Sequence, residues 1–194
     1  MKKLSAYLFL ILFSFSASSF ADDIQDLEIE DISIGDSLLD HFSKEEIENS
    51  LNYDDLPSDM KFRITEIFSS SFDLYNSMHF YHKPNDKNFI IHAISGTVKY
   101  ADINKCYKEQ INIVKELSAI MDGAEFKGPT KSIHTDDKSG KSTYTSFIFD
   151  SKTGGNAYVQ CYDWSNEMKY VDHLRISIST KEVVNWTNNN FGMN

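Results

Sequence analysis

The sequence lacks several features that mark large classes of protein. Beyond Phe20, no uncharged run comes near the roughly 18 residues that a membrane-spanning helix needs. Lysine and arginine form no block of the kind that binds phosphate backbones, so nucleic acid is excluded as an expected partner. No low-complexity linker or internal repeat divides the chain, and we therefore expect a single domain.

Motifs that identify common enzymes are missing as well. No Gly-x-Ser-x-Gly nucleophile elbow is present. The six histidines form no closed set of metal ligands with other residues. His79 and His82 are three residues apart, which points them to opposite faces of a strand. The sequence thus identifies no catalytic residue, no metal and no cofactor.

The stretch from His134 to Tyr144 matches two ligand-binding loops in part. Gly140-Lys141-Ser142 matches the last three residues of a P-loop motif, but Thr135 occupies the position of the first glycine of that motif. A calcium loop would need an aspartate at its first position and a glutamate at its twelfth, where Ser146 stands. A hairpin loop rich in turn-forming residues is therefore the favoured interpretation.

The first 21 residues have the three parts of a secretory signal peptide. Lys2-Lys3 precedes an apolar run that reaches Phe20, and Ala21 completes a small-x-small cleavage pattern. No cysteine lies near this position to carry a lipid anchor. We expect cleavage to leave residues 22–194 as one exported domain of 173 residues, located in the periplasm or outside the cell.

The negative charge of the chain is concentrated near the mature N-terminus. Residues 22–59 contain 14 acidic residues and one basic residue, Lys44, whereas residues 60–194 contain 15 acidic and 16 basic residues. A solvated surface that keeps the protein soluble is the simplest interpretation of the acidic segment. Binding of a basic partner, or weak collection of divalent cations, is the alternative.

The two cysteines, Cys106 and Cys161, are expected to form a disulfide, because an exported chain enters an oxidising compartment. Closing a loop of this length stabilises the fold by about 4 kcal/mol in the chain-entropy model. The bond would join the first turn of a predicted helix to a predicted strand.

Hydrophobic periodicity predicts an α+β domain, with a mostly antiparallel sheet of about five strands and one long helix packed across it. The helix is expected between a cap at Asp102 and Gly123, because apolar residues from Ile103 to Met121, with Ile111 among them, recur at spacings of three and four. Strands are expected in a hairpin around Pro84-Asn85-Asp86 that returns at Phe89–Val98, and at Tyr144–Asp150, Asn156–Trp164 and His173–Ser179.

Short helices are predicted at both ends of the domain. Leu27–Ile34 alternates apolar and acidic residues like an edge strand, and a helix entry follows at Ser37. Ser43 and Glu46 have capping-box spacing and predict a second short helix to about Asn49. A break is expected from Asn52 to Pro57, and a terminal helix after Thr180.

One strand carries a candidate binding face. Tyr158, Tyr162 and Trp164 alternate with residues that include Cys161, so a helix-facing Cys161 places the three aromatic side chains on the other side of the sheet. Exposed, they would bind a peptide, a sugar or an apolar ligand. The favoured interpretation is that the N-terminal segment covers them as a second core layer, because exposed patches of that size are rare in monomers.

Three runs, SIGDSLLDHFSKEEI, HTDDKSGKS and CYDWS, together resemble a group of small exported bacterial proteins of unknown function. The resemblance extends over most of the mature chain. It implies a single exported domain and carries no known activity, ligand or catalytic residue.

These observations favour an exported protein of the bacterial envelope that acts as a non-enzymatic binding or accessory module, with an envelope protein or a small molecule as its partner. The alternative is a hydrolase with a dispersed active site that uses His134 with Asp136 or Asp137. A second alternative is weak binding of divalent cations by the acidic segment.

Overall fold

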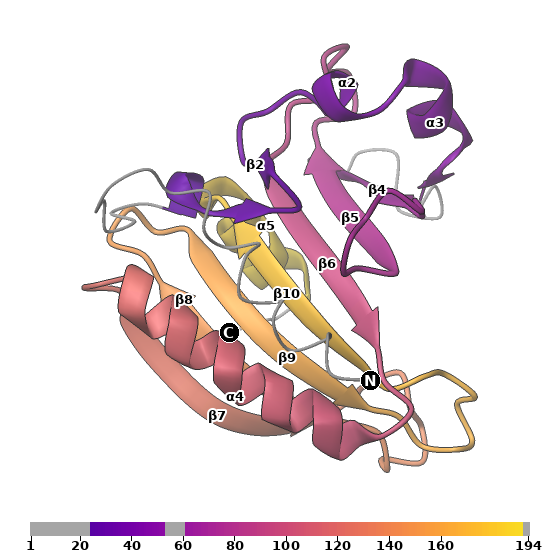
Figure 1. Ribbon diagram of the computed structural model, residues 1–194, viewed down its shortest axis with the longest axis vertical. Coiled ribbons are helices and arrows are strands. Elements are labelled where there is room, and N and C mark those ends of the chain that lie inside the picture. Colours follow the sequence, from indigo (N-terminus) through magenta and orange to yellow (C-terminus); the bar gives the residue numbers. More distant parts are fainter. Residues whose placement is uncertain (1–23, 53–60, 192–194) are drawn as a thin grey trace.

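A computed structural model describes residues 24–52 and 61–191 of the chain. Its centre is one eight-stranded antiparallel sheet (Figure 1). The predicted signal peptide, residues 1–21, and most of the predicted break after Asn52 lie outside the described residues. The strands of the sheet are β3 (Leu51–Asn52), β4 (Arg63–Ile67), β5 (Ser77–His82), β6 (Ala93–Lys99), β7 (Glu125–Ile133), β8 (Thr143–Asp150), β9 (Asn156–Asp163) and β10 (His173–Ser179).

Two four-stranded meanders make up this sheet, in the spatial order β3-β4-β5-β6-β10-β9-β8-β7. The meanders meet where β6 pairs with β10 along its whole length. The chain passes from the first meander to the second through the long helix α4 (Ile103–Ile120), which lies across one side of the sheet (Figure 1). Strands β6, β10 and β9 are therefore central, and β3 and β7 form the edges.

The α+β class, the antiparallel pairing and the packed helix are confirmed, but the expected number of about five strands is wrong. Strand β4 was missed because its two isoleucines, Ile64 and Ile67, lie an odd number of residues apart and give no period-two pattern. Strand β7 is almost entirely exposed and contains Gly128-Pro129, so it has no buried alternation to detect.

Helix α4 begins and ends close to where the sequence predicts. The Asp102 side chain accepts a hydrogen bond from the Asn104 backbone N–H at 3.0 Å, as an N-cap residue does. Gly123 follows the helix with a φ of +86°, which glycine adopts without strain. The buried stripe of α4 is rotated from the predicted one: Ile111, which the sequence placed in it, is 41% exposed. Its members are Cys106, Gln110, Ile113, Val114 and Leu117.

Two buried side chains attach α4 to the sheet. Cys106 forms the predicted disulfide with Cys161 of β9, and both residues are fully buried. One turn further along α4, Gln110 Nε2 donates hydrogen bonds to the Thr145 carbonyl oxygen at 2.7 Å and to the Val159 carbonyl oxygen at 2.9 Å. A covalent bond and two hydrogen bonds thus hold the helix over β8 and β9.

The N-terminal segment packs against the same side of the sheet as α4. Its apolar side chains, such as Leu38 and Ile47, belong to the core cluster that also contains Ile94, Val159 and Leu174 of the central strands. Its elements are η1 (Ile24–Asp26), β1 (Glu28–Ile29), β2 (Ile32–Ser33), α2 (Leu38–His41) and α3 (Lys44–Asn49).

Local sequence signals in this segment are largely confirmed. Ser37 caps α2, and Ser43 and Glu46 form both hydrogen bonds of a capping box at α3. The predicted edge strand is instead a short β1–β2 hairpin. Its turn residues, Glu30 and Asp31, have positive φ values of 56° and 59°, as in a type I′ turn.

The opposite side of the sheet carries the second helix, α5 (Lys181–Phe191), which Figure 1 shows behind β10. Trp186 and Val183 of α5 form a small apolar cluster with Phe62, Tyr81 and Ala93, near one end of the first meander. Within residues 24–52 and 61–191, no helix has the length and apolar character needed to cross a membrane.

Reduction of the disulfide should lower the free energy of unfolding by about 4 kcal/mol, because the unfolded chain regains the entropy that the closed loop denies it. Urea denaturation of the mature protein with and without dithiothreitol measures this difference. The Cys106→Ala/Cys161→Ala variant is the control and should not respond to the reductant. Equal midpoints for the oxidised and reduced wild type would contradict the expectation.

Replacing Gln110 with leucine should destabilise the protein by about 1–3 kcal/mol, because the Thr145 and Val159 carbonyl oxygens lose their buried donor. Asn112→Ala, on the exposed side of α4, is the matched control and should change stability by no more than about 0.5 kcal/mol. Similar midpoints for both variants in chemical denaturation would show that Gln110 does not anchor the helix.

Candidate functional site

The register of the strands determines which side chains face away from α4. Cys161 points to the helix, so its alternating neighbours Gln160 and Tyr162 point to the other side of the sheet. Directly paired residues share a face, and the pairs assemble two rows across the central strands. We call these ten side chains the polar face: Ser77, Thr97, Arg175, Gln160 and Ser146 in one row, and Glu66, His79, Ser95, Ser177 and Tyr158 in the next.

Most of the polar face is shielded from water. Seven of its ten side chains belong to residues that are less than one-tenth exposed: Ser77, His79, Ser95, Thr97, Ser146, Gln160 and Ser177. Burying a polar group is unfavourable unless a hydrogen bond replaces its contact with water. A polar sheet face in this position therefore needs an internal network or a bound partner.

Part of the polar face forms such a network. Gln160 Nε2 donates to Ser146 Oγ at 2.7 Å, and the Tyr162 hydroxyl donates to Gln160 Oε1 at 2.9 Å. Ser177 Oγ donates to the Ile94 carbonyl oxygen at 2.9 Å. In the same row, His79 Nε2 lies 3.4 Å from Glu66 Oε1. These contacts hold the side chains in fixed positions.

Two hydroxyl groups at the centre of the polar face stand outside this hydrogen-bond network. Within residues 24–52 and 61–191, Ser95 Oγ and Thr97 Oγ1 are buried and have no hydrogen-bond partner. Ser95 and Thr97 are 3% and 7% exposed, and they lie two residues apart on β6, so they point to the same side. A buried polar group without a partner costs about 1–3 kcal/mol. Groups of this kind commonly have a bound water, ion or ligand as their partner.

Aromatic side chains adjoin the polar face at one end of β8, β9 and β10. Tyr144, Tyr162 and His173 pair across the three strands, with ring centroids 5.6 Å and 4.6 Å apart. Trp164 stacks on Tyr162 at 6.0 Å with an angle of 16° between the rings. The His134 ring lies 4.4 Å from Trp164. We call these five residues the aromatic cluster.

The His173 imidazole is part of this cluster as a neutral ring. Burial lowers the pKa of His173 to about 4, so the imidazole is uncharged near neutral pH. Its Nδ1 lies 3.3 Å from Trp164 Nε1 and 3.0 Å from the Val171 carbonyl oxygen. The tautomer of the ring decides which of the two hydrogen bonds forms.

The three aromatic residues that the sequence singled out lie in or beside these two groups. Tyr162 and Trp164 belong to the aromatic cluster, where Tyr162 is buried and Trp164 half-buried, and Tyr158 belongs to the polar face. The expectation that the N-terminal segment covers them is wrong for residues 24–52, which pack on the side of α4. Their role in binding stays a prediction.

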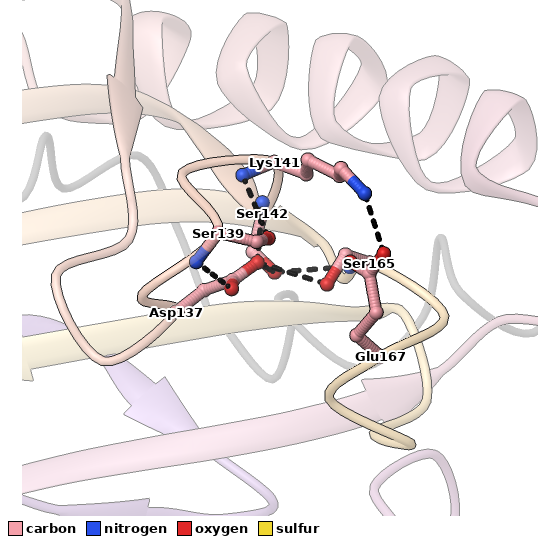
Figure 2. Close-up of polar contacts among 6 residues, drawn as sticks. All are labelled: Asp137, Ser139, Lys141, Ser142, Ser165 and Glu167. Carbon is pink, nitrogen blue, oxygen red and sulfur yellow. Dashed lines mark hydrogen bonds and ion pairs between the residues drawn. The ribbon is translucent and has the colours of Figure 1, made fainter.

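The loops next to the aromatic cluster are joined by a carboxylate (Figure 2). Asp137, in the β7–β8 loop, accepts hydrogen bonds from the Ser139 N–H at 2.8 Å, and from the N–H and hydroxyl of Ser142 at 2.9 Å and 2.6 Å. It also accepts one from the Ser165 hydroxyl of the β9–β10 loop at 2.8 Å. Because Ser165 follows Trp164 directly, this network positions the loop that begins with Trp164.

Hydrogen-bond donors surround the Asp137 carboxylate and hold the His134–Tyr144 stretch as a loop. Hydrogen bonds from Ser142 and Ser139 hold the pKa of Asp137 well below its usual range. The four hydrogen bonds occupy about as many acceptor positions as a carboxylate has. The stretch is thus a hydrogen-bonded loop, and an ion pair between Lys141 and Glu167 adds a second link between the two loops.

Of the residues proposed for a hydrolase, His134 contacts the exposed Asp136 and does not contact the Asp137 carboxylate. Asp137 bonds to serines, and His134 Nδ1 lies 3.9 Å from Asp136 Oδ2, whose side chain is 77% exposed. A hydroxyl–imidazole pair, Thr65 and His82 at 2.9 Å, is buried on the other side of the sheet. In the part of the chain that the structure describes, no three histidine, cysteine, aspartate or glutamate residues lie close enough together to hold a metal ion.

His79 and His82 lie on β5 and face opposite sides of the sheet, as their spacing predicts. His79 contacts Glu66 on the polar face, whereas His82 contacts Thr65 on the helix side.

No family model, curated protein or solved structure matches this chain. The functional interpretation therefore rests on the geometry of the chain itself.

The sequence did not single out the central residues of the polar face, Ser95, Thr97, Gln160 and Arg175. Polar residues at alternate positions of a strand normally indicate a solvated face. A usable signal was present in their chemistry. Ser95, Thr97, Ser177 and Gln160 are small or uncharged, whereas solvated faces are commonly rich in lysine and glutamate.

Asp137→Asn should lower the free energy of unfolding at neutral pH, because the new amide cannot accept from all four donors. The pKa of Asp137 is lower in the folded state than its unfolded value of about 3.9. The Asp137 carboxylate therefore contributes its full stabilisation above the unfolded pKa of about 3.9. This stabilisation is lost as the pH falls from there toward the folded pKa. The difference between wild type and variant should shrink below about pH 4.

Urea denaturation at several pH values measures this difference. Asp136→Asn is the matched control, since Asp136 is exposed and lies outside the network. It should have little effect at any pH, and a gap between wild type and Asp137→Asn that stays constant with pH would contradict the role of the carboxylate.

Proposed function

We propose that this protein is an exported, non-enzymatic binding module of the bacterial envelope, and that it holds a small polar molecule against the polar face. The observation that carries the proposal is the pair of buried hydroxyls, Ser95 Oγ and Thr97 Oγ1, which have no partner in the described part of the chain. A ligand that hydrogen-bonds to both would supply the missing partners.

The different chemistry of the two sheet faces supports this assignment. The apolar core lies between the sheet, α4 and the N-terminal segment, and it accounts for the stability of the fold. The polar face adds few apolar contacts, and its buried hydroxyls oppose folding. Ligand sites typically combine fixed polar groups with aromatic walls, and the polar face and the aromatic cluster provide both.

A ligand would approach from the aromatic end. Tyr144 and Trp164 are half-buried, and Tyr170, whose ring lies 4.9 Å from Trp164, is 61% exposed. The polar face begins directly behind them, where the Tyr162 hydroxyl donates to Gln160. Accessible aromatic rings thus lead to buried hydrogen-bonding groups.

Export is supported by the predicted signal peptide at residues 1–21 and by the Cys106–Cys161 disulfide, since such bonds persist in oxidising compartments. The resemblance to small exported bacterial proteins points the same way. Cation binding by the acidic segment stays an untested alternative.

Native mass spectrometry of the mature protein, purified gently from its host, tests the proposal. Wild type should carry extra mass that disappears on denaturation, and Ser95→Ala/Thr97→Val should lose it. The exposed Ser70→Ala is the control and should retain it. Extra mass retained by the double variant would contradict the proposal, and so would a bare polypeptide mass for a wild type that also binds no added ligand through the two hydroxyls.

The stability of the ligand-free proteins supplies a second readout. Ser95→Ala/Thr97→Val should be at least as stable as the wild type, because it removes hydroxyls that have no partner among the residues that the structure describes. Ser177→Ala is the matched comparison, since it removes a buried hydroxyl on the same face that is bonded to Ile94. It should be destabilised by about 1 kcal/mol. A large loss of stability in the double variant would assign a structural role to the two hydroxyls.

A further inference from the structure

We infer that the ligand of the polar face is a neutral saccharide, an inference that rests on the proposed function. It combines three observations: the charges that line the polar face, the hydrogen-bonding character of its unpaired groups and the geometry of the adjoining rings.

The polar face carries little charge that is available to an ionic ligand. Seven of its ten side chains are uncharged: Ser77, Ser95, Thr97, Ser146, Tyr158, Gln160 and Ser177. Among the other three, Glu66 and His79 lie 3.4 Å apart as a pair. Arg175 lies over the Tyr162 ring, 5.4 Å from its centroid. Arg175 keeps its positive charge over that ring, so it is the one permanent cation among these ten side chains, and Glu66 already lies beside His79. Because uncharged groups outnumber these charges seven to three, we favour a neutral ligand.

The unpaired groups suit a ligand that both donates and accepts hydrogen bonds. The hydroxyls of Ser95 and Thr97 can each donate one bond and accept two. A carboxylate or phosphate only accepts, and an ammonium group only donates. Sugar hydroxyls do both, so they can satisfy either hydroxyl of the protein in any orientation of its proton.

The aromatic cluster suits the apolar C–H face of a sugar ring. The rings of Tyr144 and Tyr162 are inclined by 27°, and those of Tyr162 and Trp164 by 16°, so the three lie nearly parallel. A pyranose ring presents C–H groups on its face, which pack against aromatic rings as other apolar surfaces do. Tyr162 is itself buried, so the half-buried rings of Tyr144 and Trp164 provide the accessible part of this surface, and the Tyr162 hydroxyl links it to Gln160 of the polar face.

Other ligand classes fit less well. An extended peptide typically pairs with a sheet edge, whereas the polar face lies on the central strands. A lipid chain requires an apolar wall, which the buried hydroxyls of the polar face do not provide. A molecule with hydroxyl groups and an apolar ring face matches both halves of the site.

The test uses three neutral trisaccharides, maltotriose, cellotriose and triacetylchitotriose, with trigalacturonate as an anionic comparison. Isothermal titration calorimetry on the ligand-stripped mature protein should detect at least one neutral trisaccharide and no tighter binding of the anion. Ser95→Ala/Thr97→Val and Trp164→Leu should each weaken binding by about tenfold or more, because each removes a class of contact. Phe126→Ala is the control and should bind like the wild type, since that exposed ring lies beside Phe149 on the helix side.

Sugar analysis of the mass released from host-purified protein separates the possible outcomes. Released hexose or amino sugar, or binding of a neutral trisaccharide that depends on the two hydroxyls, supports the inference. A released molecule without sugar, bound through Ser95 and Thr97, overturns the saccharide and leaves the proposed function standing. A bare host-purified protein that binds no trisaccharide contradicts both. Circular dichroism of each variant checks that lost binding does not reflect unfolding.

Discussion

The attachment of α4 to β9 determines the chemistry of the whole sheet. The Cys106–Cys161 bond and the two hydrogen bonds from Gln110 hold the helix on one side, and the alternation of side chains along each strand then assigns every residue to a face. The side of α4 receives the N-terminal segment and becomes the apolar core. The other side is left with the polar face, the aromatic cluster and α5.

Under the proposed function, this arrangement separates stability from recognition. Apolar burial under α4 supplies the main driving force for folding, since burial of apolar area is the dominant favourable contribution. On the other side, Ser95 and Thr97 oppose folding because their buried hydroxyls have no partner within residues 24–52 and 61–191. Such groups commonly have a bound water, ion or ligand as their partner. Asp137 contributes from outside the sheet by fixing the loop that begins with Trp164.

Local sequence signals predicted much of the fold. The bounds of β10, the Asp102 cap, the Ser43 capping box and the disulfide all depend on neighbouring residues or on one pair of cysteines, and the structure confirms them. Strand β4 was missed because its isoleucines give no period-two pattern, and strand β7 because it is almost entirely exposed. The small or uncharged residues of the polar face gave a compositional signal, but their assembly could not be predicted, because Ser95, Ser177 and Tyr158 become neighbours only through the pairing of β6 with β10 and of β10 with β9. That register joins residues from both halves of the chain, and local periodicity contains no information about it.

The central claim is that the polar face is a ligand site and not a second structural layer. A crystal structure of the mature protein, purified from its host without denaturation, tests this claim most directly. We predict a bound non-protein molecule within hydrogen-bonding distance of Ser95 Oγ and Thr97 Oγ1, with part of it against the rings of Tyr162 and Trp164. The claim would be contradicted if both hydroxyls were bonded to groups of the protein itself and no molecule occupied the polar face.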